Sequence, residues 1–169
     1  CIPIDPFYLT WKAHEAGVKT RFIELAGEVN QSMPEYVVHI VAKALNAAEK
    51  SIRSSRILVL GLAYKSNVDD TRESPSFKLI ELLAEEGAII DYYDPHVNKI
   101  PKIRKYPELS GKKSVEWNEE SVRGFDLVLI STAHYSVNYQ ELGQWAKVVV
   151  DTRNAMSEVT DANAKIYSA

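Results

Sequence analysis

A polar loop over residues 61–75 carries the residue types best suited to binding a phosphorylated ligand. It follows the apolar run 57–60, which predicts a buried strand, and it leads into a predicted helix. The loop contains one lysine, Lys65, one arginine, Arg72, and two adjacent aspartates. A loop of this kind places backbone N–H groups and basic side chains at the carboxyl edge of a parallel sheet, where nucleotides bind. The sequence therefore predicts a nucleotide-binding loop.

The charged residues of this loop also have purely structural interpretations. Lys65 could be a solvated loop lysine, and Arg72 could form an ion pair with Asp69, Asp70 or Glu73. The adjacent aspartates could be part of a metal site, but no third ligand stands at a suitable spacing. We therefore expect no metal here.

The single cysteine, Cys1, is the other candidate for chemistry. A lone cysteine is more often a small buried hydrophobe than a nucleophile. A free thiol, with a pKa of ~8.5, becomes an effective nucleophile when positive charge or a helix N-terminus lowers that value. The short helix expected to begin near Pro6 could supply such an N-terminus.

From residue 56 onward, apolar runs alternate with helical patterns, which is typical of a parallel sheet. Ser74 caps a predicted helix with Pro75 at its first position, and Gly87 ends it. We predict an α/β fold: a Rossmann-like parallel sheet with helices on both faces. The span 98–118 is expected to be a loop with at most one short strand. The predicted strands are 56–60, 88–94, 126–131 and 147–151, with a further helix at 139–146.

Residues 1–53 are predicted to be helical. A short helix from Pro6 to Ala16 is expected to end at Gly17. Ser32 followed by Glu35 forms a capping-box pattern, which predicts that a long helix over 33–53 begins there, with Pro34 in its first turn. One apolar face follows helical spacing, so we interpret the helix as an interface or inter-domain helix, and we expect this face to meet a second copy, giving a homodimer. That face comprises Val37, Ile40, Val41, Ala44, Leu45, Ala48 and Ile52.

The overall composition excludes several classes of protein. The 169 residues carry a net charge of -3, which disfavours a nucleic-acid partner. No apolar run reaches the ~20 residues needed to cross a bilayer, so no membrane association is expected. One cysteine cannot form an internal disulfide, which favours a cytoplasmic setting. Because the chain begins at Cys1 rather than methionine, we expect a fragment of a longer protein.

Three segments resemble motifs of the UDP-glucose/GDP-mannose dehydrogenase family, in the same order. They are residues 1–7, residues 61–75, and Asp151-Thr152-Arg153-Asn154. The first segment, extended through Ala13, is most similar to the bacterial UDP-N-acetylglucosamine (UDP-N-acetylhexosamine) 6-dehydrogenase branch.

The resemblance implies two regions, 1–53 as the end of a central helical dimerisation domain and 54–169 as a UDP-sugar-binding domain. Family members begin with an NAD-binding domain, but this chain has no Gly-x-Gly-x-x-Gly pattern and its strand-loop motif has Gly61 alone. The family's catalytic lysine and asparagine would also lie upstream of Cys1. We therefore expect a C-terminal fragment that is inactive by itself.

The implied reaction oxidises the C6 alcohol of UDP-N-acetylglucosamine, or a related UDP-sugar, to the uronate with two NAD⁺. Cys1 would form a thiohemiacetal with the intermediate aldehyde, and then a thioester that water hydrolyses. The sequence around Cys1 now favours the nucleophile over the buried hydrophobe. Asp5 resembles the carboxylate that orients the water, although beside Pro6 it could equally cap the helix.

The resemblance assigns Tyr64, Lys65 and Arg153 to the UDP-sugar and Arg72 to the NAD side of the site. Arg153 could instead be a structural or helix-capping arginine. Thr132 and His134 also follow a predicted strand, but a lone histidine there is expected to be exposed and solvated. Asp94 follows the second strand and is expected to form a turn with Pro95.

Two other functions remain open. The first is a non-catalytic UDP-sugar-binding or dimerisation module, encoded without the NAD-binding domain. The second is an ordinary NAD-binding domain, which the solitary Gly61 disfavours.

Overall fold

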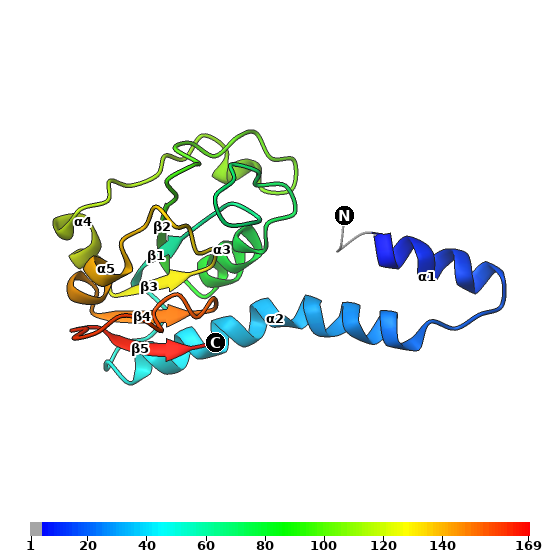
Figure 1. The fold of residues 1–169 in the computed structure, drawn as a ribbon, viewed down its shortest axis with the longest axis horizontal. Coiled ribbons are helices and arrows are strands. Elements are labelled where there is room, and N and C mark those ends of the chain that lie inside the picture. The colour runs from blue at the N-terminus through cyan, green and yellow to red at the C-terminus, as the bar shows by residue number, and fades with distance from the viewer. Residues whose placement is uncertain (1–4) are drawn as a thin grey trace.

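The structure is a computed structural model, and it describes residues 5–169. Two helices, α1 (Asp5–Glu15) and α2 (Arg21–Asn46), precede an α/β domain. Figure 1 shows α2 running beneath the sheet and then extending away from it, with α1 folded back alongside its far end. None of the described helices is long and apolar enough to span a bilayer.

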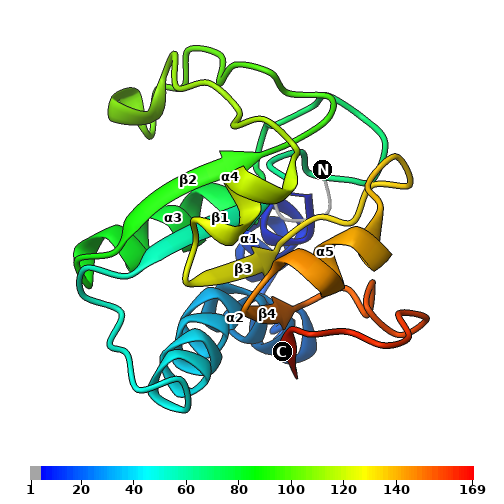
Figure 2. The same ribbon diagram turned by 90° about the vertical axis from the view of Figure 1, so that its left-hand side faces the viewer.

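The α/β domain is built on five parallel strands in the order β2-β1-β3-β4-β5. The chain passes from β1 to its neighbour β2 and then crosses back to β3 on the other side of β1, so the strand order reverses between β1 and β3. Figure 2 shows β2, β1, β3 and β4 lying side by side in this order. The strands are β1 (Arg56–Leu60), β2 (Ile89–Tyr93), β3 (Leu127–Ile130), β4 (Val148–Asp151) and β5 (Lys165–Ser168).

Helices cover both faces of the sheet, which confirms the predicted α/β class. On one face α2 and α3 (Pro75–Glu85) pack against alternate strand residues such as Ile57 and Leu129. On the other face α4 (Glu119–Arg123) and α5 (Tyr139–Trp145) pack against residues such as Leu58 and Val128. A single-turn 3₁₀ helix, Pro107–Leu109, lies in the long connection after β2.

The capping-box prediction for α2 was wrong. The helix begins at Arg21 and continues through Pro34, and the Ser32 hydroxyl donates to the Val29 carbonyl instead of capping a terminus. Serine can satisfy its hydroxyl in this way inside a helix, so the pattern does not mark a helix start by itself. The predicted end was also wrong, since α2 stops at Asn46 and turns follow it.

The predicted apolar face of α2 covers the sheet of its own chain. Val37, Val41 and Leu45 are buried in one cluster with β1, β3 and β4. This finding corrects the expectation that the face meets a second copy, because burial against the sheet leaves it unavailable. Large exposed apolar side chains lie instead on α1 and on the first half of α2.

Candidate functional site at the carboxyl edge of the sheet

The site is built where the strand order reverses, between the carboxyl ends of β1 and β3, as in other open α/β sheets. Gly61 begins the loop after β1, and its N–H donates to the Tyr93 carbonyl (2.8 Å). Its φ is +86°, and a Cβ atom there would lie 2.2 Å from the carbonyl oxygen of Thr132. Glycine therefore lets the β1 and β3 loops approach more closely than any other residue could.

Asp94, at the end of β2, holds the start of the Gly61 loop. Its Oδ2 accepts from the N–H groups of Leu62 (2.7 Å) and Ala63 (3.0 Å), while Oδ1 accepts from those of His96 (2.8 Å) and Val97 (3.0 Å). The bonds to His96 and Val97 form a turn, as predicted. Burial favours a higher pKa for Asp94, but the hydrogen bonds outweigh it and hold that pKa below its usual value.

His134 is completely buried, so the expectation of an exposed, solvated histidine was wrong. Its Nδ1 accepts from the N–H of Asn67 (3.0 Å), and its Nε2 lies 3.2 Å from Oδ2 of Asp94. An atom that accepts from a backbone N–H carries no proton, so the proton of the ring is on Nε2 and is donated to Asp94. The ring is therefore neutral and oriented at both nitrogens.

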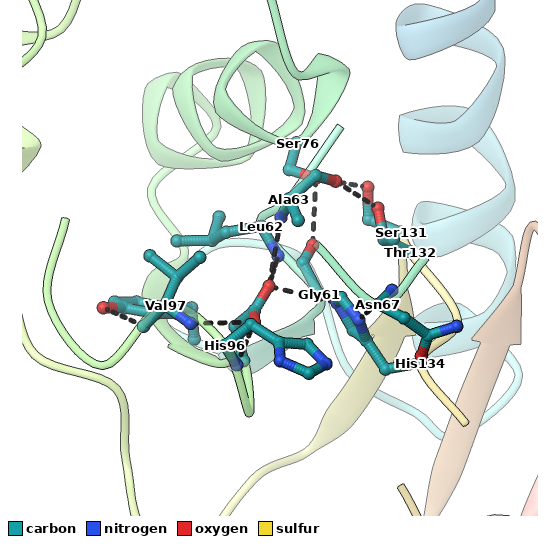
Figure 3. A network of polar contacts seen from close by, with 12 residues as sticks. Gly61, Leu62, Ala63, Asn67, Ser76, His96, Val97, Ser131, Thr132 and His134 are labelled. Atoms are coloured by element: carbon teal, nitrogen blue, oxygen red, sulfur yellow. Dashed lines mark hydrogen bonds and ion pairs between the residues drawn. The ribbon is translucent and has the colours of Figure 1, made fainter. Parts of the chain in front are cut away.

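Further hydrogen bonds join the loops after β1 and β3 to each other and to the start of α3, and Figure 3 shows them around Gly61. Thr132 donates through Oγ1 to the Ala63 carbonyl (2.7 Å), and Ser76 donates through Oγ to the Gly61 carbonyl (3.0 Å). The hydroxyls of Ser76 and Ser131 lie 2.7 Å apart. All of these side chains are buried, so the two loops form one rigid unit.

These contacts decide whether this edge could hold a dinucleotide. Asp94 stands where a Rossmann domain places the acid that binds the ribose of NAD, but its carboxylate oxygens are occupied by protein donors. The space beside Gly61 is filled by Thr132. The residues at this edge do not fit NAD in the Rossmann manner.

Lys65 and Tyr64 lie on the part of the loop beyond this rigid unit. The Lys65 side chain is exposed, with its Nζ 5.9 Å from the centre of the Tyr64 ring, which is half-buried. The Tyr64 N–H donates to the Asp70 carbonyl (2.8 Å), which closes the loop on itself. The loop therefore presents an amine at the carboxyl edge of the sheet.

Arg72 forms the ion pair that the structural interpretation predicted, with Asp70 as its partner. Its Nε lies 2.9 Å from Oδ1 and its Nη2 2.7 Å from Oδ2, a two-pronged contact. The hydrogen bond from the Arg72 side chain lowers the pKa of Asp70 to about 2. Both side chains are well exposed, so this pair orients the guanidinium and adds little stability.

Arg153 follows β4 and reaches toward the neighbouring strand. Its Nε donates to the Ser131 carbonyl (2.6 Å), and its N–H donates to Oδ1 of Asp151 (2.8 Å). It borders a shallow open hollow with Asp151 and the C-terminal Ala169. Ser131 thus joins the Arg153 loop to the rigid unit around Gly61.

The two proposed catalytic residues, Cys1 and Asp5, are distant in sequence from the loops of this unit. Cys1 falls outside the described residues. Asp5 is an exposed residue in the first turn of α1, and within residues 5–169 no hydrogen bond or ion pair joins it to the loop 61–75. The structure therefore places Lys65, Arg72 and Arg153 at one edge of the sheet and does not bring Asp5 into contact with them.

Comparison with known protein families identifies the family of this chain. The sequence model of the UDP-binding domain of the UDP-glucose/GDP-mannose dehydrogenase family matches residues 58–158, more than half of its length. The chain belongs to this family. The matched region begins within β1 and holds β2, β3, β4 and the loops that carry Lys65 and Arg153.

Individual relatives agree with this assignment. The UDP-N-acetyl-D-mannosamine dehydrogenase of Methanococcus vannielii is 32% identical over 165 residues, which are 93% of this chain and 35% of the relative. The UDP-N-acetyl-D-glucosamine 6-dehydrogenase of Pseudomonas aeruginosa is 28% identical over 164 residues, 94% of this chain and 37% of the relative. The chain spans about a third of the length of these relatives.

A solved structure of a family member shares the fold. The UDP-D-ManNAc dehydrogenase from Pyrococcus horikoshii superposes with a TM-score of 0.77 at 29% identity. The match covers 98% of this chain and 37% of the other. Both helices before the sheet therefore belong to the shared architecture.

Sequence reasoning missed the role of the residues that hold the loop 61–75 in place, namely Asn67, Ser76, Asp94 and His134. Asp94 gave a signal only as a turn with Pro95, and His134 only as a residue that follows a predicted strand. The contacts that Asn67, Ser76 and His134 make join segments 55 or more residues apart, which no local pattern reveals.

Proposed function

We propose that this chain is the C-terminal part of an NAD-dependent UDP-sugar 6-dehydrogenase, and that its edge loops bind the UDP-sugar. The observation that carries the proposal is the placement of Lys65 and Arg153 on loops at one sheet edge, where the strand order reverses. The family's name for the matched region, a UDP-binding domain, supports it.

The electrostatics of the two side chains suit a diphosphate. Among the described residues, the hydrogen bonds of the Arg153 side chain run through Nε alone, which leaves both terminal nitrogens for a ligand. Lys65 adds a second positive charge on an exposed side chain. Arginine forms paired hydrogen bonds with phosphate oxygens, and lysine contributes as a point charge.

The same proposal gives Cys1 the role of nucleophile in the second oxidation and Asp5 the role of orienting the hydrolytic water. NAD supplies the hydride acceptor for both oxidations when it is bound. Since the edge of this sheet does not fit NAD in the Rossmann manner, we propose that the cofactor is held mainly by residues outside this chain. Arg72, oriented by Asp70, is the contact this chain contributes.

For the substrate we propose a UDP-N-acetylhexosamine, with UDP-N-acetylglucosamine as the first candidate. Relatives named for both the mannosamine and glucosamine sugars match this chain at similar length, so both epimers belong in any test. UDP-glucose and GDP-mannose complete the panel.

Release of NADH by the longer protein that contains this chain tests the proposal. We expect the wild-type protein to release two NADH per UDP-N-acetylhexosamine and Cys1→Ser to form no uronate. Lys65→Ala should raise the KM for the UDP-sugar roughly 10- to 100-fold, because a hydrogen bond to a charged group is lost. Lys19→Ala, which changes an exposed lysine in the α1–α2 connection, is the matched control. Binding of UDP without NADH release from any sugar would instead indicate a non-catalytic binding module.

A homodimer is part of the same proposal, through a surface different from the one predicted. We propose that the exposed apolar residues of α1 and the first half of α2 meet a second copy, since a stable monomer rarely exposes so many. Sedimentation should then show a dimer, and Phe22→Glu, at a side chain that is 89% exposed, should shift it to monomer. A wild-type monomer would contradict this. The residues are Phe7, Tyr8, Leu9, Trp11, Phe22, Leu25, Val29, Met33 and Tyr36.

A further inference from the structure

The loop that carries Lys65 is fixed at two points on either side of it. Before Lys65, the N–H groups of Leu62 and Ala63 bind Asp94. After Lys65, the N–H of Asn67 binds Nδ1 of His134. Asn67 adopts a left-handed backbone (φ +61°), so the chain turns sharply at the second point.

We propose that His134 is a positioning residue for the UDP-sugar site, because its Nδ1 holds Asn67 and thereby sets where Lys65 lies. The inference rests on the proposed role of Lys65 in binding the UDP-sugar. His134 itself is completely buried and so acts through the loop.

The surroundings of His134 make the bond to Asn67 strong and directional. Oδ2 of Asp94 accepts from Nε2, which fixes the proton there and leaves Nδ1 free to accept. Tyr139 holds the backbone of His134, since its hydroxyl accepts from the N–H (3.0 Å) and donates to the carbonyl (3.2 Å). Burial raises the pKa of Tyr139 to about 12, so that hydroxyl stays protonated. The ring of His96 packs 5.0 Å from that of His134, and water is excluded from the ring nitrogens.

Two substitutions distinguish the roles of the two ring nitrogens of His134. His134→Asn places an amide oxygen near the position of Nδ1, so it keeps an acceptor for Asn67 but loses the donor to Asp94. His134→Gln reaches the position of Nε2, so it keeps the donor but leaves the N–H of Asn67 without a partner. Each loses one of the two hydrogen bonds of the ring, and we expect similar losses of thermal stability.

Titration of the 169-residue chain with UDP tests the positioning role. We expect His134→Gln to weaken UDP binding roughly 10-fold, the effect of one lost hydrogen bond, and His134→Asn to bind nearly as wild type does. Equal UDP affinities for both variants, whether lowered or unchanged, would overturn the role of Nδ1. A wild-type chain that fails to bind UDP would contradict the proposed function itself, whereas normal binding by His134→Gln contradicts only the positioning role.

A measurement on the wild-type chain keeps the inference testable if either variant fails to fold. The amide proton of Asn67 should exchange with solvent far more slowly than those of Ser66 and Val68 in the same exposed loop, because it is bonded to a buried ring. The ¹⁵N signals of His134 should show a bare Nδ1 and a protonated Nε2. Rapid exchange at Asn67, or a protonated Nδ1, would overturn the inference.

Discussion

Gly61→Ala is expected to destabilise the α/β domain by roughly 2–5 kcal/mol and to abolish UDP binding. The added Cβ would lie 2.2 Å from the Thr132 carbonyl oxygen and 2.7 Å from the Thr132 Cβ. Thr132 cannot move away easily, because its N–H donates to the Leu60 carbonyl and its Oγ1 to the Ala63 carbonyl. The loops after β1 and β3 must therefore separate, and the Lys65 loop moves with them.

Unfolding in urea, followed by circular dichroism, measures the loss of stability. Gly17→Ala is the matched control, since Gly17 also has a positive φ (+73°) but has nothing within 4 Å of an added Cβ. It should cost only about 1 kcal/mol, the penalty of the backbone conformation alone. An equal cost for the two variants would show that the close approach to Thr132 is not important.

Asp94→Asn is expected to lower the free energy of unfolding by roughly 3–5 kcal/mol at neutral pH. The change keeps the size of the side chain but replaces one carboxylate oxygen with an amide group that faces N–H donors. Either the Leu62 and Ala63 pair or the His96 and Val97 pair then loses its acceptor. Buried N–H groups without partners account for the cost.

The effect of Asp94→Asn should also depend on pH. Because the pKa of Asp94 is lower in the folded chain, its ionised form stabilises the fold at pH values above the ordinary value of 3.8. That contribution is lost as the pH falls through the lowered pKa, so the stabilities of wild type and variant should converge in acid. Asp161→Asn, at an exposed residue whose left-handed φ (+56°) suits asparagine, is the control. An effect no larger than the control's at neutral pH would contradict the importance of the carboxylate.

The sequence predicted most of the sheet because its signals are local. The apolar runs at β1, β3 and β4 are buried along nearly their whole length. The predicted start of α3 is confirmed in the same way, since Ser74 accepts from the N–H of Ser76 and Pro75 occupies the first helical position. β5 was missed because its residues are largely exposed at the sheet edge and carry no apolar run.

The errors arose where tertiary contacts override local patterns. The start of α2 lies at Arg21 because α1 packs against the first half of the helix: the Phe7 ring occupies the space where a Cβ on Gly27 would be. Nothing near Ser32 and Glu35 signals that contact. His134 was expected in solvent because its partners, Asn67 and Asp94, are distant in sequence.

The 26 residues of α2 form a rod about 39 Å long, and within residues 5–169 only its C-terminal part packs against the sheet. Its last turns are embedded under the sheet, whereas its first half packs against α1. A small rotation of the embedded end would therefore produce a larger displacement at the other end of the helix. Pro34 lies inside this helix and lacks an N–H for the Asn30 carbonyl, so the helix has one backbone hydrogen bond fewer there. The separation between Asp5 and the edge loops is thus set by the straightness of one helix.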